Sequence, residues 1–557
     1  MDRGKRFLIL FLFLITFWIL LPAVLIIASL LLDSALNMGF SPAGIIPVLS
    51  WSLLIPSSIL LVLAVIQFRL QAGEWPVSAL PSRDLAQRGL YGVWRHPIYL
   101  FFVLVMVSLG LVLGSGSMLA LVIPIFSGAV VIYAGHEEKR LAAAFGSCCR
   151  GYIKRTAAIV PKLQILVRCL LLPIVRLVFG VKVTGRESIP LKGPLFVVAS
   201  HRSFLDPLFA ACGVKRYLNY VTTHQMFRGR LSSFLFSRIG CIPRKRYARD
   251  AACVRSIYQV IRECGAVVIF PEGERSWTGA MGPLKEEVIR LLLRFPDVPI
   301  LPLRIQGNYN VWPRWRSRPA AGRVKVEVLP AFTPDRNETA TSLSEKLRLL
   351  IEPNDPGVFE NNSVSTRGIE KILYRCPACM EFVSGFDSGA SSFRCRECGT
   401  VFHLSGTYSL CFSNGERDVT VSLDQAYRGI RITPADLKST CSACGKEITL
   451  PDEERLIAYL PDVEIVRDEL EEALRSKERG SMMLTDRRVI FNTGSVSEVL
   501  HSSTASVTTE GSARLQMFCS SSNTLYQLKI DSGSVPLWQD LIVAAVSEAT
   551  GRMPVRS

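Results

Sequence analysis

A histidine and an aspartate separated by four residues stand at the end of a strand-like stretch of the chain. The apolar residues 194–199 predict a buried strand, which would present His201 at the edge of a sheet. Ser203 is a residue type that caps helices, so a helix is expected to begin there, with Asp206 in its first turn. The Asp206 carboxylate would then accept a hydrogen bond from Nδ1 of His201 and fix the imidazole tautomer. This arrangement leaves Nε2 free to act as a general base toward a substrate hydroxyl.

A His-x4-Asp pair alone occurs by chance in many chains, but three further blocks follow it in order. They are Gly-Cys-Ile-Pro-Arg-Lys-Arg at residues 240–246, Val-Val-Ile-Phe-Pro-Glu-Gly-Glu-Arg-Ser at 267–276 and Val-Pro-Ile-Leu-Pro-Leu at 298–303. Together with His201 and Asp206, these blocks resemble the glycerolipid acyltransferase family over about residues 165–335. The resemblance implies an α/β domain with a mixed sheet flanked by helices. It also implies transfer of an acyl group from acyl-CoA or acyl carrier protein to a glycerophosphate or lysolipid.

The same resemblance assigns roles to individual residues. It implies that His201 is the base and that Asp206 orients it. The acceptor site that it implies consists of two phosphate-binding arginines and two lining residues, namely Arg246, Arg275, Glu272 and Gly273. Glu274 departs from the family, which commonly has threonine there. An additional carboxylate beside Arg275 is expected to weaken binding of a doubly charged phosphate and to favour a less anionic or zwitterionic acceptor.

Uncharged, apolar stretches fill much of the first part of the chain, at residues 7–32, 41–68, 97–114 and 118–135. The first two are long enough to cross the hydrocarbon core of a bilayer as helices, and the last two are shorter. A cleaved signal peptide would account for the first stretch, but its apolar core is too long and further spans follow. Lysine and arginine are absent from residues 33–41 and 114–117 and frequent at the other flanks. We therefore expect four spans with both ends in the cytosol, in a bacterial inner membrane.

Ionisable side chains stand at the predicted cytosolic ends of two spans. His96 and Tyr99 belong to an Arg-His-Pro-x-Tyr stretch, and Glu137 and Glu138 follow the fourth span. Such residues can be solvated among lipid headgroups, or they can bind a cationic, polar cofactor. Residues 45–160 resemble the isoprenylcysteine carboxyl methyltransferase and phospholipid N-methyltransferase family, in which these motifs hold S-adenosylmethionine. The resemblance implies a second, methyl-transferring activity toward a lipid, although the chain departs from the family's pattern at Leu90, Gly92, Phe101, Phe102 and Cys149.

The formal net charge of +17 requires an anionic partner. Nucleic acid and an anionic membrane surface are the two candidates, and the predicted spans favour membrane lipids, so no nucleic acid is expected. Residues 163–179 are apolar but interrupted by arginine and proline, which is typical of a helix lying in the membrane interface. Residues 226–257 carry eight arginines or lysines among phenylalanines and leucines. They form either a solvated basic face or, as we prefer, a surface pressed onto anionic headgroups.

Two Cys-x2-Cys pairs lie in the last third of the chain, Cys376 with Cys379 and Cys395 with Cys398. Their spacing fits one tetrahedral zinc ion in a fold that resembles a zinc ribbon, and a redox pair would not need two matched pairs. Four thiolates leave no open coordination position, so the role is expected to be structural. The fifteen cysteines of this cytosolic chain are expected to be thiols or metal ligands rather than disulfides. A second zinc would need a third pair and its companions, Cys441, Cys444, Cys411 and His403.

The last hundred residues alternate apolar and polar side chains in short segments. A helix-like stretch at residues 536–548, amphipathic in pattern, follows them. The order of elements resembles the pleckstrin-homology and GRAM-like class, chiefly through Thr-Asp-Arg-Arg-x-Ile-Phe at residues 485–491. Such modules bind lipid headgroups or proteins.

The chain is therefore expected to contain a membrane unit, an acyltransferase domain, a linker, a zinc-ribbon region and a PH/GRAM-like domain, at residues 1–160, 161–350, 351–370, 371–450 and 451–557. Two alternatives to a single acyltransferase remain. One is a bifunctional enzyme that also methylates a lipid. The other is a non-catalytic membrane scaffold that recruits partners, which the set of His201, Asp206 and Arg275 disfavours.

Overall fold

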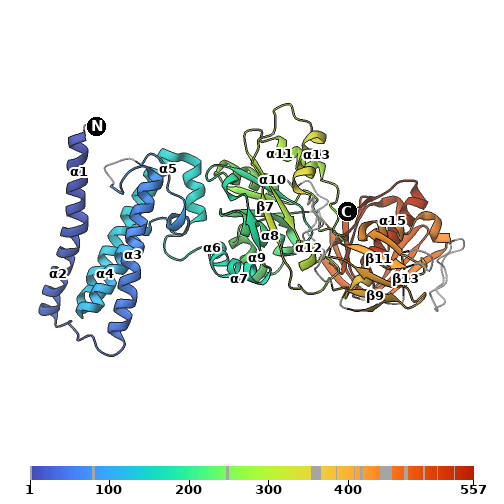
Figure 1. Ribbon diagram of the computed structural model, residues 1–557, viewed down its shortest axis with the longest axis horizontal. Coiled ribbons are helices and arrows are strands. Elements are labelled where there is room, and N and C mark those ends of the chain that lie inside the picture. Colours follow the sequence, from blue (N-terminus) through green and yellow to red (C-terminus); the bar gives the residue numbers. More distant parts are fainter. Residues whose placement is uncertain are drawn as a thin grey trace.

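The computed structural model shows three successive parts along its longest axis (Figure 1). Apolar helices lie at the N-terminal end, an α/β unit in the middle, and two antiparallel sheets at the C-terminal end. The structure describes residues 3–77, 82–245, 250–352, 365–383, 386–389, 391–406, 408–413, 418–438, 454–469, 475–493, 496–510, 512–531 and 533–556.

The N-terminal part consists of α1 (Arg3–Ile15), α2 (Leu21–Leu36), α3 (Ile46–Ala72), α4 (Pro97–Leu113) and α5 (Ile123–Arg155). Three helical stretches are long and apolar enough to cross a membrane, namely Phe7–Leu36, Ile46–Ala72 and Met118–Arg155. The last of them is interrupted by a non-helical backbone conformation at Gly146. The third predicted span, residues 97–114, corresponds to α4, whose 17 residues extend only about 25 Å at 1.5 Å per residue. Three spanning helices are thus supported by length and composition. The count of four and the orientation stay predictions.

The middle part is a seven-stranded mixed sheet in the order β1-β7-β6-β2-β5-β3-β4. These strands are β1 (Lys182–Thr184), β2 (Leu195–Ala199), β3 (Leu218–Thr223), β4 (Cys241–Arg244), β5 (Ala266–Ile269), β6 (Ile300–Gln306) and β7 (Lys325–Val328). Strand β2 pairs in parallel with β5 and β6, while β7 runs antiparallel to β6. The predicted mixed sheet is therefore confirmed.

Helices cover both faces of this sheet. The apolar core on one face includes α7 (Leu172–Val178) and α8 (Asp206–Gly213), and that on the other includes α10 (Ala251–Arg262), α11 (Glu286–Leu293) and α13 (Ala340–Ile351). All residues of β2 and β5 are buried. Burial on both faces explains why these strands consist of continuous apolar runs rather than alternating patterns.

Two antiparallel sheets form the C-terminal region, which we define as residues 365–556. The first contains β8 (Phe386–Ser388), β9 (Ser392–Cys395), β10 (Val401–Leu404), β11 (Ser409–Ser413) and β12 (Asp418–Ser422). The second contains eight strands, of which β20 (Val555–Arg556) pairs in parallel with β17 and the rest pair antiparallel. Its other strands are β13 (Leu456–Glu469), β14 (Arg475–Thr485), β15 (Arg488–Asn492), β16 (Val496–Leu500), β17 (Thr504–Glu510), β18 (Arg514–Cys519) and β19 (Thr524–Lys529).

Helix α15 (Val535–Thr550) packs inside the C-terminal region and has no broad solvent-facing side. Residues 535–546 are buried except for the half-buried Leu537. The sequence pattern predicted an amphipathic helix, and the structure corrects this. Residues from both C-terminal sheets and from the segment around Ile369 and Tyr374 belong to the same apolar core as the helix, so little of the helix surface remains for water.

A disulfide joins Cys148, near the end of α5, to Cys264, which follows α10. The sequence analysis expected thiols or metal ligands, so this cysteine pair is a correction. The two residues are 116 positions apart, and they meet because the last turns of α5 pack against the end of α10. That contact between separate domains cannot be read from cysteine spacing.

Candidate active site

His201 and Asp206 meet at the carboxyl end of β2, as their spacing predicted. Nδ1 of His201 lies 2.9 Å from Oδ2 of Asp206. The same Oδ2 accepts the backbone N–H groups of Arg202 at 2.7 Å and Ser203 at 2.8 Å. Helix α8 begins at Asp206, directly after Leu205, and no side chain caps the first turn of this helix. The predicted Ser203 cap is therefore wrong, because the Asp206 carboxylate itself satisfies the amides of this turn.

The Asp206 carboxylate is completely buried and receives one further hydrogen bond. Nδ2 of Asn308 donates to Oδ1 of Asp206 at 2.7 Å. Asn308 follows β6, which lies beside β2 in parallel, so the two carboxyl ends meet at one edge of the sheet. The sequence analysis missed Asn308. The signal that could have identified it is a polar residue two positions after the buried strand β6.

The His201 imidazole is held neutral by its surroundings. Its ring stacks on Phe270, with 4.4 Å between ring centroids. Burial lowers the pKa of His201, and the hydrogen bond and charge of Asp206 oppose this effect. The positive charges of Arg275 and Arg314 lower the pKa further. A neutral imidazole whose Nδ1 faces a carboxylate has its Nε2 lone pair available to accept a proton.

Glu272 accepts backbone hydrogen bonds at the site, and its role in lining the acceptor site stays a prediction. Its Oε1 accepts the backbone N–H of His201 at 2.7 Å, and its Oε2 accepts that of Gly282 at 2.9 Å. Burial raises the pKa of Glu272 to about 7. Gly273 turns the chain with a φ of 74°, a backbone conformation that favours glycine. Both residues thus shape the segment that follows β5, residues 270–282, which we call the β5 loop.

Arg275 lies in the β5 loop close to the reaction centre. Its guanidinium carbon is 5.4 Å from the centroid of the Phe204 ring. Burial lowers the pKa of Arg275, whereas the carboxylates of Asp206, Glu274 and Glu510 act in the opposite direction. The second predicted phosphate-binding residue, Arg246, lies outside the described residues.

The structure supplies a partner for Glu274, the residue that departs from the family pattern. Nη1 of Arg314 is 3.4 Å from Oε2 of Glu274 and donates to the backbone carbonyl of Arg275 at 2.9 Å. The Arg314 guanidinium also lies over the Trp277 ring, 4.4 Å from its centroid. Arg314 therefore balances the charge of Glu274, and no pattern in the sequence had pointed to it.

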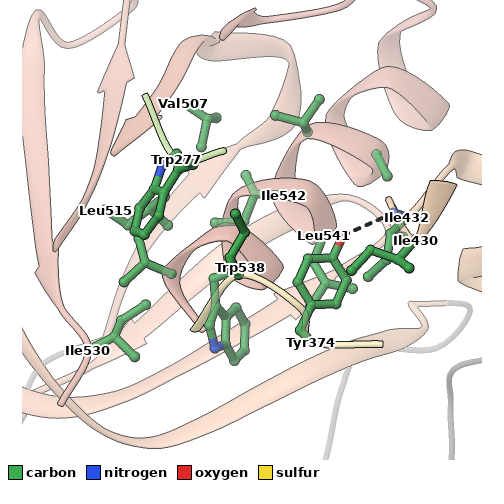
Figure 2. Close-up of a cluster of buried hydrophobic side chains, with 14 of the residues drawn as sticks. Trp277, Tyr374, Ile430, Ile432, Val507, Leu515, Ile530, Trp538, Leu541 and Ile542 are labelled. Atoms are coloured by element: carbon green, nitrogen blue, oxygen red, sulfur yellow. Dashed lines mark hydrogen bonds between the residues drawn. The ribbon is translucent and has the colours of Figure 1, made fainter. Parts of the chain in front are cut away.

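The β5 loop is held from two sides. The backbone N–H of Ser276 donates to the carbonyl of His201 at 2.9 Å. On the other side, Trp277 enters the apolar core of the C-terminal region, where Figure 2 shows it near Val507 and Leu515. The loop thus connects the reaction centre to a domain more than 200 residues further along the chain.

The residues implied in S-adenosylmethionine binding also come together, at the start of α4 and in the middle of α5. Tyr99 donates to Oε2 of Glu137 at 3.0 Å, and the imidazole of His96 lies 3.4 Å from Glu137 and 3.3 Å from Glu138. Arg95 donates to Glu138 at 2.7 Å, so one of the two carboxylates already has a cationic partner. The predicted cluster therefore exists as a geometric unit.

The four predicted zinc ligands converge as well. The Sγ atoms of Cys376, Cys379, Cys395 and Cys398 all lie within 4.8 Å of one another. Sγ of Cys376 and Sγ of Cys398 are 3.8 Å apart, and four sulfurs at zinc bonding distance in a tetrahedron are about 3.8 Å apart. The donor set therefore fits one zinc ion. His403 on β10 is paired in register with Cys411 on β11. Cys441 and Cys444 lie outside the described residues.

Comparisons with known proteins agree with the middle part of this description. The Acyltransferase family model matches residues 180–306. The chloroplastic 1-acyl-sn-glycerol-3-phosphate acyltransferase BAT2 of Brassica napus is 25% identical over 134 residues, which are 24% of this chain and 38% of the relative. A probable 1-acyl-sn-glycerol-3-phosphate acyltransferase of Mycoplasma genitalium is 32% identical over 136 residues, 23% of this chain and 50% of the relative.

The crystal structure of the 1-acyl-sn-glycerophosphate (LPA) acyltransferase PlsC from Thermotoga maritima has 18% sequence identity and a TM-score of 0.29, covering 38% of this chain and 86% of that chain. The chain spans half or less of the length of the two curated relatives described above. The middle of the chain, which contains His201, Asp206, Glu272 and Arg275, is thus similar to 1-acyl-sn-glycerol-3-phosphate acyltransferases.

Proposed function

We propose that the protein is a membrane-bound acyltransferase that moves a fatty acyl group from acyl-CoA or acyl carrier protein to the hydroxyl of a lysophospholipid. The observation that carries the proposal is the pairing of His201 with a fully buried Asp206. Nε2 of His201 takes the proton of the acceptor hydroxyl as its oxygen attacks the thioester carbonyl. The new C–O bond forms, the C–S bond breaks, and the departing thiolate takes the proton from the imidazolium.

The acceptor carries a phosphate that Arg275 binds, and we assign the same role to Arg246. Glu274 raised the question of whether a doubly charged phosphate is accepted here. Arg314, which lies 3.4 Å from Glu274, offsets part of the negative charge that this carboxylate places beside Arg275. The balance of charges therefore supports a 1-acylglycerol-3-phosphate-type acceptor, the substrate for which the relatives are named.

The acyltransferase domain would bind its lipid substrate at the membrane surface. In the stretch Leu163–Val178, four leucines are exposed and Leu172 is buried in the core. The exposed ones are Leu166, Leu170, Leu171 and Leu177, of which Leu177 is 85% exposed. The arginines of this stretch point inward, where Arg168 donates to the carbonyl of Val214 and Arg176 to that of Cys212. A helical stretch that exposes most of its leucines, and whose arginines are hydrogen-bonded to the rest of the domain, suits contact with acyl chains. We place it against the cytosolic leaflet, below four spans with both ends cytosolic.

The test uses membranes that contain the full chain, labelled acyl-CoA or acyl carrier protein, and a lysophospholipid. We expect His201→Ala to abolish transfer and Asp206→Asn to reduce it by about two to four orders of magnitude, the usual contribution of general base catalysis. His224→Ala is the matched control, since His224 is exposed on a short turn after β3. Full activity of His201→Ala would contradict the proposal.

A second activity is supported by one observation, the contact of His96 and Tyr99 with Glu137 and Glu138. We propose that this cluster holds S-adenosylmethionine, which supplies a methyl group when it is bound. The carboxylates would bind the polar groups of the cofactor at the membrane boundary. We expect saturable binding of S-adenosylmethionine by the intact protein, weakened by His96→Ala or Glu137→Ala. Absence of binding at millimolar cofactor would rule this activity out without affecting acyl transfer.

A further inference from the structure

A cavity of about 670 Å³ lies between the end of α5 and the outer face of α10. Most of its wall is apolar side-chain surface, and its cationic lining residues are three solvent-exposed arginines, Arg150 from α5 and Arg255 and Arg262 from α10. Val254 and Tyr258 contribute an apolar wall. Neither the acyltransferase proposal nor the methyltransferase proposal uses this cavity.

The cavity has an excess of positive charge. Its one lining carboxylate, Glu263, is already engaged by Lys154 at 2.5 Å and by the side-chain amide of Gln259 at 3.1 Å. Among the described residues, no carboxylate forms an ion pair with Arg150, Arg255 or Arg262. Three guanidiniums against one neutralised carboxylate favour an anionic ligand, and a guanidinium matches the geometry of phosphate oxygens.

The walls of the cavity are fixed to each other. The Arg155 guanidinium donates to the backbone carbonyl of Glu263 at 2.9 Å. The disulfide between Cys148 and Cys264 joins the same two segments covalently. The two helices that carry the arginines are therefore held at a fixed separation, so little rearrangement of the backbone would oppose binding.

The position of the cavity separates it from the reaction centre. Helix α10 ends at Arg262, just before the amino end of β5, whereas His201 and the β5 loop lie at the carboxyl ends of the parallel strands β2 and β5. The cavity thus faces the opposite edge of the sheet.

The cavity also lies near the end of an apolar helix. Helical geometry in the stretch Met118–Arg155 is interrupted at Gly146, where φ is 58° and ψ is -132°. The part before this interruption, residues 118–145, extends about 42 Å at 1.5 Å per residue, which already exceeds the hydrocarbon core of about 30 Å. The last turns of the stretch therefore extend beyond the core, at the depth of the lipid headgroups.

We propose that this cavity binds the phosphate headgroup of an anionic phospholipid. Arg150, Arg255 and Arg262 hold the phosphate oxygens, and Val254 and Tyr258 contact the adjoining apolar part of the lipid. The site joins the membrane helices to the acyltransferase domain through a lipid that is neither acyl donor nor acceptor. Basic pockets beside membrane helices are suited to such headgroups.

The experiment counts lipids retained by the full chain released from nanodiscs that contain phosphatidylcholine and phosphatidylglycerol, using native mass spectrometry. We expect Arg255→Gln/Arg262→Gln to retain one phosphatidylglycerol fewer than the unaltered chain, with about tenfold weaker binding for each guanidinium lost. Arg290→Gln/Arg336→Gln is the control, since it removes the same charge from two exposed arginines outside the cavity. Arg255→Lys/Arg262→Lys, which keeps the charge, should retain more lipid than the glutamine variant.

Three outcomes would overturn the proposal. The first is equal retention of phosphatidylglycerol by the glutamine variant and the control. The second is equal retention of phosphatidylcholine and phosphatidylglycerol. The third is displacement of the lipid by millimolar inorganic phosphate, which would indicate a site for soluble anions. Because the measurement counts lipids and not product, its failure would leave the proposed acyl transfer untouched.

Discussion

The indole N–H of Trp277 donates a hydrogen bond to the hydroxyl of Thr509 at 3.0 Å, and this bond joins the β5 loop to β17. The adjacent Thr278 donates to Asp424 of the C-terminal region at 2.8 Å. Arg275, the proposed phosphate ligand, lies two residues before Trp277, and the charge of Glu510 on β17 also acts on it. The C-terminal region therefore supports the part of the reaction centre that would hold the acceptor.

Weakening this junction is expected to impair acceptor binding more than chemistry. Trp277→Phe and Thr509→Val each remove one buried hydrogen bond and keep most of the packing, a loss of about 1 kcal/mol. We expect the KM for the lysophospholipid to rise about fivefold in each variant, with little change in kcat, because Arg275 contacts the substrate before and during transfer. Steady-state assays of the full chain in vesicles measure both constants.

A double-mutant cycle distinguishes this positioning role from general destabilisation. If the two side chains act through their mutual hydrogen bond, the double variant should show no larger KM than either single variant. Thr420→Val, which alters an exposed hydroxyl on β12, should leave KM unchanged. A fall in kcat with unchanged KM would contradict the role assigned to the junction.

The pH dependence of acyl transfer should report the environment of His201. Burial and the charges of Arg275 and Arg314 lower the pKa of His201 below its usual value of 6.5. The neutral base is present above this pKa and lost below it. Protonation of His201 should therefore reduce the rate at a midpoint below 6.5, distinct from any step near pH 7 that arises from Glu272, whose pKa is about 7. Rates measured across this range with one acceptor give the midpoint.

Breaking the Arg314–Glu274 ion pair from either side should move this midpoint in opposite directions. Arg314→Met removes a positive charge that lowers the pKa of His201, so the midpoint should rise. Glu274→Gln removes a negative charge that lies 3.4 Å from Arg314 and should lower the midpoint. Both variants lose the same contact, so a shift in the same direction would show that structural loss, and not charge, controls the base.

Sequence patterns predicted contacts between residues close in the chain better than contacts between distant ones. The His201–Asp206 pair and the two Cys-x2-Cys pairs follow from local spacing, and the structure brings both together. Asn308 reaches Asp206 from 102 positions away, and its placement depends on the pairing of β2 with β6. No local pattern singled out Trp277, because the residues that surround it come from strands more than 200 residues later in the chain. Strand order and domain packing decide such contacts, and neither leaves a spacing pattern.

Asn308, the residue that the sequence analysis missed, should be needed for both stability and turnover. Asn308→Ala removes the donor to Oδ1 of the fully buried Asp206. An unsatisfied buried acceptor costs about 1–3 kcal/mol, so the thermal unfolding midpoint should fall. A misplaced Asp206 should also lower kcat, and Asn308→Gln should restore neither fully. Asn219→Ala is the control, since its side chain donates to Ala266 at the other end of the strands. Unchanged kcat in Asn308→Ala would show that Asp206 is oriented without it.

Zinc in the C-terminal region should affect the reaction centre, because the cysteine cluster and Trp277 share one apolar core. The four thiols fit a closed, structural zinc site, whose loss withdraws folding free energy. We expect Cys376→Ser to contain one zinc fewer per chain than the unaltered protein, measured by elemental analysis, and to show a raised KM for the lysophospholipid. Cys169→Ser, which alters an exposed cysteine outside the cluster, should match the unaltered chain in both measurements. An equal zinc content in the Cys376 variant would exclude the cluster as a metal site, whereas zinc loss with unchanged KM would separate this site from acceptor binding.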